Sequence, residues 1–100
     1  MIYTDAVAAG AALLDAKRPE WASQIDTMIL DMADGDRCIL GQLSGDYSSA
    51  VAWLEIDFGS DFGFNLPNDD YFAPDIDARW AWLHELWVGE IDARTPADRC

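Results

Sequence analysis

The last third of the chain carries apolar side chains at a spacing that places them on one face of a helix. Five of them follow one another at steps of four, three, four and four: Ile76, Trp80, Leu83, Trp87 and Ile91. At ~100° per residue, these positions fall within about 80° of one another around a helix axis. We therefore expect a long helix that begins near Pro74 and runs past Glu90, with this stripe turned toward a core.

A second helical pattern occupies the start of the chain. Thr4 is suited to an N-cap, Gly10 lies among alanines on a slim face, and Pro19 ends the segment. The apolar positions at helical spacing are Val7, Ala11 and Leu14. Residues 19–26 predict a short second helix, with Trp21 and Ile25 on one side.

The middle of the chain predicts two further short helices. Asp36 is expected to cap the first, Gly45 to end it and Asp46 to cap the second. The side chains expected to face inward are Ile39, Leu40 and Leu43 in the first, and Tyr47, Val51 and Leu54 in the second. We also expect Gly41 and Gly45 to let these two helices approach closely.

The segments around these helices are less regular. Residues 27–36 predict a buried connection, because apolar side chains at 28, 29, 30 and 32 precede an Asp/Gly turn. Phe62, Phe64 and Leu66 alternate, so we expect either an irregular aromatic loop or a short extended segment before the long last helix. We predict a mainly α, compact domain of about four helices at residues 1–94, followed by a C-terminal tail at residues 95–100.

The charge balance limits the kinds of partner. Six Lys and Arg residues against nineteen Asp and Glu give a net charge of −13. Such a surface repels nucleic acid and anionic membranes, which bind basic patches. It suits a protein partner, above all a basic or nucleic-acid-binding one. The sequence does not determine the oligomeric state.

The cysteines and hydropathy point to a cytoplasmic protein. Cys38 lies in an apolar run and is expected to be buried, and Cys100 is the last residue. A disulfide between the two is left open by the sequence. No signal segment opens the chain, and no apolar run approaches ~18 residues.

No recognisable catalytic or cofactor-binding pattern is present, so we expect neither an enzyme nor a bound cofactor. Residue 42 is Gln where a nucleophile elbow around Ser44 requires Gly, and the sole lysine, Lys17, is not in a phosphate loop. Two aspartate clusters keep a divalent-metal site or an enzyme open as an alternative: Asp31, Asp34 and Asp36, and Asp69, Asp70 and Asp75. Capping and turn formation also explain these aspartates.

The last helix offers a candidate partner-binding surface. Trp82 and Leu86 lie to one side of its apolar stripe. The acidic residues expected around this apolar anchor are Asp77, Glu85 and Asp92. An apolar anchor with an acidic rim is typical of a protein-binding patch. Trp82 and Leu86 could equally widen the buried face.

Four segments carry a resemblance to a family. They are LLDAKRPEWASQID at 13–26, CILGQLSGDYSSAVAWL at 38–54, FGF at 62–64 and IDARWAWL at 76–83. In order and motif, they resemble small acidic proteins of actinobacteria and actinobacteriophages for which no activity is known. The resemblance implies a phage-related protein that binds a host or phage protein, and a location in the cytoplasm of the bacterial host.

Together these observations favour a non-enzymatic protein-interaction module. The competing hypothesis is an acidic DNA mimic that inhibits a nucleic-acid-binding protein, because a high density of carboxylates imitates the charge of DNA. The third is an enzyme or metal-binding protein that uses the clustered aspartates.

Overall fold

The computed structural model describes residues 2–45, 47–56, 59–66 and 68–94. Four α-helices lie within these ranges: α1 (Ile2–Lys17), α2 (Ile39–Ser44), α3 (Tyr47–Leu54) and α4 (Ile76–Arg94). Three short 3-10 helices connect them: η1 (Trp21–Gln24), η2 (Gly59–Phe62) and η3 (Asn68–Phe72). The predicted mainly α fold, with a long last helix, is confirmed. The predicted tail at 95–100 lies outside the described residues.

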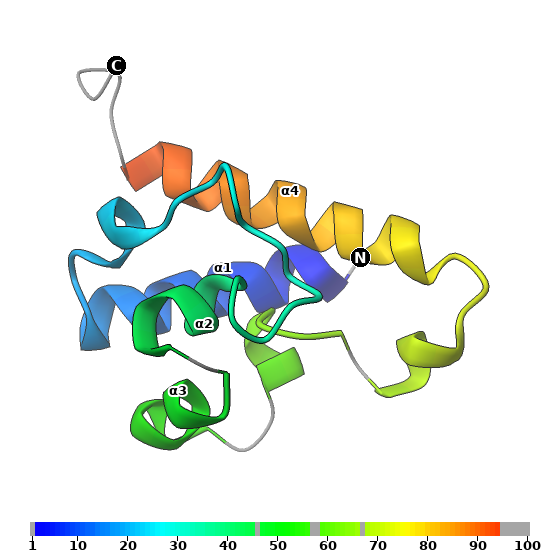
Figure 1. The fold of residues 1–100 in the computed structure, drawn as a ribbon, viewed down its shortest axis with the longest axis horizontal. Coiled ribbons are helices and arrows are strands. Elements are labelled where there is room, and N and C mark those ends of the chain that lie inside the picture. The colour runs from blue at the N-terminus through cyan, green and yellow to red at the C-terminus, as the bar shows by residue number, and fades with distance from the viewer. Residues whose placement is uncertain (1, 46, 57–58, 67, 95–100) are drawn as a thin grey trace.

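The two longest helices, α1 and α4, lie side by side and run in the same direction (Figure 1). Tyr3 near the start of α1 contacts Trp82, and Asp15 near its end contacts Arg94. Seen in Figure 1, α2 lies in front of α1, and α3 lies on the side of α1 away from α4. The connection between η1 and α2 crosses in front of α4 before it returns to α2. This crossing brings residues 28–32 to one flank of α4.

The core centres on Trp87, which is completely buried in the middle of α4. Its ring stacks on Phe64 at a centroid distance of 5.3 Å and meets Trp21 edge-on at 5.6 Å. Its indole Nε1 donates a hydrogen bond of 2.6 Å to the carbonyl oxygen of Gly63. A buried tryptophan needs such a partner for its N–H, so Trp87 fixes the connection at 62–64 against the helix.

Gly10 allows α1 and η2 to touch through their backbones. A Cβ at this position would lie 2.0 Å from the carbonyl oxygen of Phe62, which no side chain can occupy. The predicted slim face of α1 is therefore confirmed, and its neighbour is the backbone of η2.

The structure corrects several predictions about helix ends. Helix α1 begins at Ile2, so Thr4 lies inside it and is not its N-cap. Helix α2 is capped by Cys38, whose Sγ accepts the Gly41 N–H at 3.3 Å, and Asp36 instead belongs to the preceding turn. The predicted stop at Gly45 is confirmed, because this residue has a left-handed φ of 90°. The predicted cap at Asp46 lies outside the described residues.

Close packing at Gly41 differs from the expectation. A Cβ there would meet Gly35 and Asp36 at 2.3–2.8 Å, whereas a Cβ at Gly45 would meet nothing within 4 Å. Gly41 is therefore needed because the turn before α2 packs directly against its Cα. Gly45 is needed only for its left-handed backbone conformation.

The irregular aromatic loop expected before the last helix is confirmed, and the alternative of a short extended segment is not needed, because no strand occurs in the described ranges. Phe62 ends η2, and the turn that follows has Gly63 at a φ of 72°. One prediction about the other connection is wrong in part. In the connection at 27–36, Leu30 and Met32 are buried as expected, but Met28 and Ile29 are exposed. Their exposure creates the surface described next.

Candidate protein-interaction surface

The five predicted partner-binding residues do not gather on one patch. Trp82 lies on the flank of α4 that faces α1, where its ring is 4.9 Å from that of Tyr3. It remains 39% exposed. Leu86 is half-buried and packs against the core, so it widens the buried face.

The three acidic residues of the predicted patch are all exposed. By helix geometry, Glu85 points ~60° from Trp82 around the axis, and Asp77 and Asp92 lie further round. Fifteen residues separate Asp77 from Asp92, which corresponds to about 22 Å along the helix. Of the five, Glu85 borders a depression beside α4.

That depression is a groove of about 480 Å³ between α4 and the connection that precedes α2. We call it the loop–helix groove. Its walls are formed by Met28, Ile29, Leu30, Asp31, Met32 and Arg37 on one side, and by Trp80, Ala81, His84 and Glu85 on the other. A mainly apolar floor with a few charged groups at the rim is the usual composition of a binding groove.

Two side chains at the edge of this groove are unusually exposed. Met28 is 91% exposed and Ile29 is 50% exposed. Large apolar side chains that remain in water beside a groove mark a surface that another molecule can cover. The sequence carried only a weak signal for this surface, because both residues belong to an apolar run before an Asp/Gly turn, and such a run is equally typical of a buried connection.

A network centred on Asp26 holds these side chains outward. The Asp26 carboxylate accepts the Met28 N–H at 2.9 Å, and its carbonyl accepts the Ile29 N–H at 3.3 Å. Gln42 of α2 fixes Asp26 in turn: its Oε1 accepts the Asp26 N–H at 2.7 Å, and its Nε2 donates to the Asp26 carbonyl at 3.2 Å. The Gln42 amide also donates to the carbonyl of Arg37 at 3.0 Å. The loop that carries Met28 is therefore tied to the core, and Gln42 is a supporting residue that sequence reasoning missed.

The rim of the groove carries both signs of charge. Asp31 and Glu85 are exposed and acidic, whereas Arg37 is basic and lies 3.9 Å from the carboxylate of Asp34. The groove lining thus carries two acidic groups and one basic group, on a chain whose net charge is −13.

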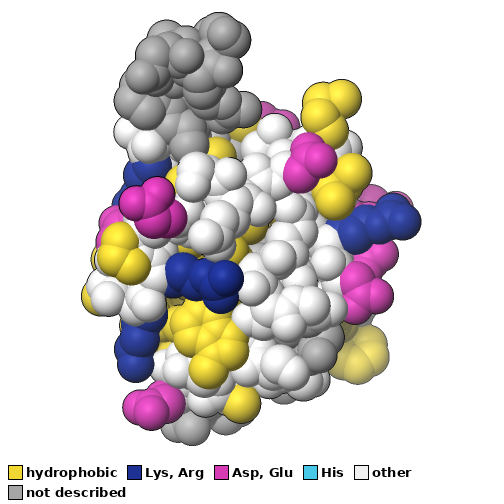
Figure 2. Space-filling model, turned by 60° about the vertical axis from the view of Figure 1, so that its left-hand side comes forward, with side chains coloured by type: hydrophobic (Ala, Val, Ile, Leu, Met, Phe, Trp, Pro, Cys, Tyr) yellow, Lys and Arg dark blue, Asp and Glu magenta, His cyan; other side chains and the backbone are white. Residues whose placement is uncertain are grey.

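Several other basic side chains are held against aromatic rings or acids. Figure 2 shows dark blue Lys and Arg side chains lying against yellow hydrophobic ones on the side face. The guanidinium of Arg18 lies 5.8 Å from the ring centroid of Trp53, and that of Arg94 lies 5.5 Å from that of Trp21.

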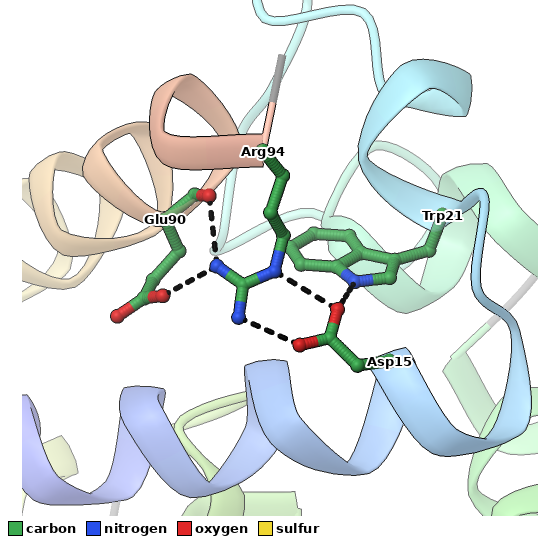
Figure 3. A network of polar contacts seen from close by, with 4 residues as sticks. All are labelled: Asp15, Trp21, Glu90 and Arg94. Atoms are coloured by element: carbon green, nitrogen blue, oxygen red, sulfur yellow. Dashed lines mark hydrogen bonds and ion pairs between the residues drawn. The ribbon is translucent and has the colours of Figure 1, made fainter. Parts of the chain in front are cut away.

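A polar cluster joins the ends of α1 and α4 (Figure 3). Arg94 contacts both carboxylate oxygens of Asp15 and also Glu90, at 2.7 Å. Hydrogen bonding to Arg94 lowers the pKa of Asp15, with a further contribution from the Trp21 indole. A second cluster joins the opposite ends: Arg79 pairs with Asp75 and Asp70, and Asp70 accepts the Tyr3 hydroxyl. These clusters fasten the two helices, so we interpret them as structural.

In the first aspartate cluster, Asp31 and Asp34 act as turn residues, whereas Asp70 and Asp75 of the second cluster pair with Arg79. Asp31 accepts the Ala33 N–H at 3.0 Å, and Asp34 accepts the Asp36 N–H at 2.8 Å. In the described part of the chain, no three His, Cys, Asp or Glu side chains lie together as a metal site would require. Among the described helices, none has the length and apolar character needed to cross a bilayer.

Comparison with protein-family models, with curated proteins and with solved structures finds no match to this chain. The functional argument therefore rests on the loop–helix groove and the charge around it.

Proposed function

We propose that this chain is a non-enzymatic protein-interaction module that binds a protein through the loop–helix groove. The observation that carries the proposal is the exposure of Met28 and Ile29 on a loop that Gln42 ties to the core. A loop that is already fixed loses little conformational entropy when a partner binds, so this apolar surface is favourable for binding.

Charge complementarity indicates the partner's chemistry. The chain carries −13, and Asp31 and Glu85 lie at the groove. We infer a partner segment with an apolar anchor flanked by Lys or Arg, since such charges speed association and orient the segment. Arg37 at the same rim disfavours a segment that is basic throughout.

The resemblance to small acidic actinobacterial and phage proteins supports a phage-related role. In that role, the partner is a host or phage protein in the cytoplasm of the bacterial host. Trp82 lies on the other flank of α4 from the groove and is 39% exposed, so it is an additional contact for a large partner.

The experiment is affinity capture from a nuclease-treated actinobacterial lysate, with variants on an immobilised support. Met28→Ser/Ile29→Ser removes the apolar surface without changing the charge. Phe72→Ser is the matched control, because Phe72 is 89% exposed and does not border the groove. We expect one partner to be retained by the wild type and the control and lost by the double variant. Equal retention by all three proteins would contradict the proposal.

The acidic DNA mimic remains the second candidate, and the charge of −13 favours it. The two differ in their response to salt. The partner of a mimic dissociates steeply as salt rises, because salt screens the charge–charge attraction that holds it. Its affinity should be the same for the wild type and for Met28→Ser/Ile29→Ser. A partner held by the groove survives higher salt and depends on both residues.

A further inference from the structure

A second cavity, of about 250 Å³, adjoins the loop–helix groove, with which it shares Met32 and Trp80. We call it the aromatic pocket, because four of the side chains that line it are aromatic: Tyr47, Phe64, Tyr71 and Trp80. These four come from α3, η3, α4 and the turn after η2. The tertiary fold alone brings them together.

The rings that line the pocket are not all parallel. Tyr71 and Trp80 are tilted against each other by 55°, with their centroids 6.1 Å apart. Phe64 is fully buried and stacks on Trp87, so it forms a rigid floor. Tyr47 is half-buried. A cation within about 6 Å of such ring faces is attracted by their quadrupoles.

Several polar atoms of the pocket already have partners. The Asn65 Oδ1 accepts the Tyr71 hydroxyl and the Leu66 N–H, and its side chain also bonds to Tyr47. The Cys38 Sγ accepts the Gly41 N–H at 3.3 Å. The acceptors that remain are few, chiefly the lone pairs of the tyrosine hydroxyls, so a ligand with several N–H donors would lose more hydrogen bonds to water than the pocket replaces.

The charge around the pocket favours a cation. Its described lining residues include no Lys or Arg that would repel a cation and no Asp or Glu, so the local attraction comes from the rings. The chain as a whole carries −13, which raises the local concentration of cations. The volume is slightly below the ~300–1,000 Å³ of sites for drug-sized ligands, so the ligand group is small.

We propose that the aromatic pocket binds an ammonium group whose protons are replaced by methyl groups. Such a group carries positive charge for the rings and has no N–H donor to leave unpaired. Two sources supply this chemistry: a free trimethylammonium compound, or a methylated lysine on the protein partner. Only the second source rests on the proposed function, because it requires a segment that runs from the loop–helix groove into the pocket.

The test is an NMR titration of the full chain in which choline chloride replaces sodium chloride stepwise, so that the ionic strength stays at about 0.1 M. We expect saturable shifts of the Asn65 side-chain amide and the Trp80 indole, with half-saturation at about 1–10 mM. The neutral isostere 3,3-dimethyl-1-butanol and methylammonium are the matched ligands. Both should bind at least about tenfold more weakly, the first for lack of charge and the second for its unpaired N–H donors.

Two substitutions at Tyr71 distinguish the contribution of its ring to binding from that of its hydroxyl. Tyr71→Leu should weaken choline binding about tenfold, whereas Tyr71→Phe, which keeps the ring, should bind like the wild type. Phe72→Leu is the control at the neighbouring exposed aromatic residue, which does not line the pocket. Thermal unfolding of each variant verifies that the fold is retained.

A peptide that carries trimethyllysine between apolar residues distinguishes the two sources. If the peptide binds the wild type more tightly than choline does, and binds Met28→Ser/Ile29→Ser only as tightly as choline does, the pocket is assigned to a protein partner. Equal binding of peptide and choline assigns it to a small molecule and leaves the groove proposal to its own test. Shifts that do not saturate, equal binding of the neutral isostere, or unchanged affinity in Tyr71→Leu would overturn the inference.

Discussion

Arg94, the last residue of α4, makes two parallel hydrogen bonds to Asp15 of α1: Nε to Oδ1 at 2.9 Å and Nη2 to Oδ2 at 2.8 Å. The same Oδ1 accepts the indole N–H of the buried Trp21 at 2.9 Å. One carboxylate therefore connects α1, η1 and α4 (Figure 3). Because two-pronged geometry is specific to a guanidinium, the contact fixes both the spacing and the rotation of the helix ends.

Two substitutions at Asp15 separate its charge from its role as an acceptor. Asp15→Asn keeps an oxygen for Trp21 and should lower the free energy of unfolding by about 0.5–1 kcal/mol, a modest figure because the carboxylate is half exposed. Asp15→Ala also leaves the Trp21 N–H unpaired and should cost about 1–3 kcal/mol. Urea titration of both variants measures the difference. Equal losses would show that Trp21 does not depend on this acceptor.

The Asp15 contact also predicts a pH dependence. Arg94 holds the pKa of Asp15 below its ordinary value of 3.8. A carboxylate with a lowered folded pKa stabilises the fold fully above its unfolded pKa, and this contribution is lost as pH falls through the folded pKa. The stability gap between wild type and Asp15→Asn should thus be constant near neutral pH and shrink below about pH 3.8. A gap that widens in acid would contradict the sign.

Gly10 and Gly89, both inside long helices, predict opposite effects of alanine. A methyl group at Gly10 would collide with the Phe62 carbonyl, and the shift of η2 should cost about 1–3 kcal/mol. A Cβ at Gly89 meets nothing within 4 Å, so Gly89→Ala should stabilise by up to about 1 kcal/mol through helix propensity. Thermal unfolding of the pair provides its own control. Stabilisation by Gly10→Ala would disprove the close approach of α1 and η2.

The two tryptophans Trp87 and Trp82 should differ sharply in their effect on stability. Trp87→Phe removes the donor to Gly63 and leaves a void in a fully buried site, at a cost of about 2–3 kcal/mol. Trp82→Phe keeps an aromatic contact to Tyr3 at a partly exposed site and should change stability by about 0.5 kcal/mol or less. Chemical denaturation measures both. A large loss from Trp82→Phe would place Trp82 in the core.

Tyr3 predicts a loss of stability in alkali. Burial, followed by the hydrogen bond to Asp70, raises the pKa of Tyr3, while Arg79 partly opposes this. A raised folded pKa means that the contribution is complete below the unfolded pKa of about 10 and is lost as pH rises through the folded value. Stability measured between pH 9 and about 11.5 should fall less in Tyr3→Phe than in wild type. The slope that remains includes Tyr47, whose pKa is also raised by burial. Identical slopes would exclude a role for Tyr3.

The sequence determined the helices that carry a long apolar stripe. The spacing from Ile76 to Ile91 defined α4, because a helix repeats every ~3.6 residues whatever it packs against. Leu83, Trp87 and Ile91 of this stripe are buried as expected, and Ile76 and Trp80 at its start are half-buried. The left-handed stop at Gly45 was predicted for the same kind of local reason.

The candidate site followed from the sequence only in part. Glu85 borders the groove, but Trp82 faces Tyr3 on the other flank of α4 and Leu86 packs against the core. Periodicity gives the angle of a side chain around its own helix. It does not tell which neighbouring element covers that angle.

The exposure of Met28 and the pocket around Trp80 were decided only by the tertiary structure. Met28 is exposed because its loop is bonded to α2: Gln42 accepts the backbone N–H of Asp26, sixteen residues earlier in the chain. The aromatic pocket around Trp80 joins residues from three helices and a turn. Local pattern is set by neighbours in the chain, and it therefore specifies helices. Contacts across long separations depend on how those helices pack, and they alone create the groove and the pocket.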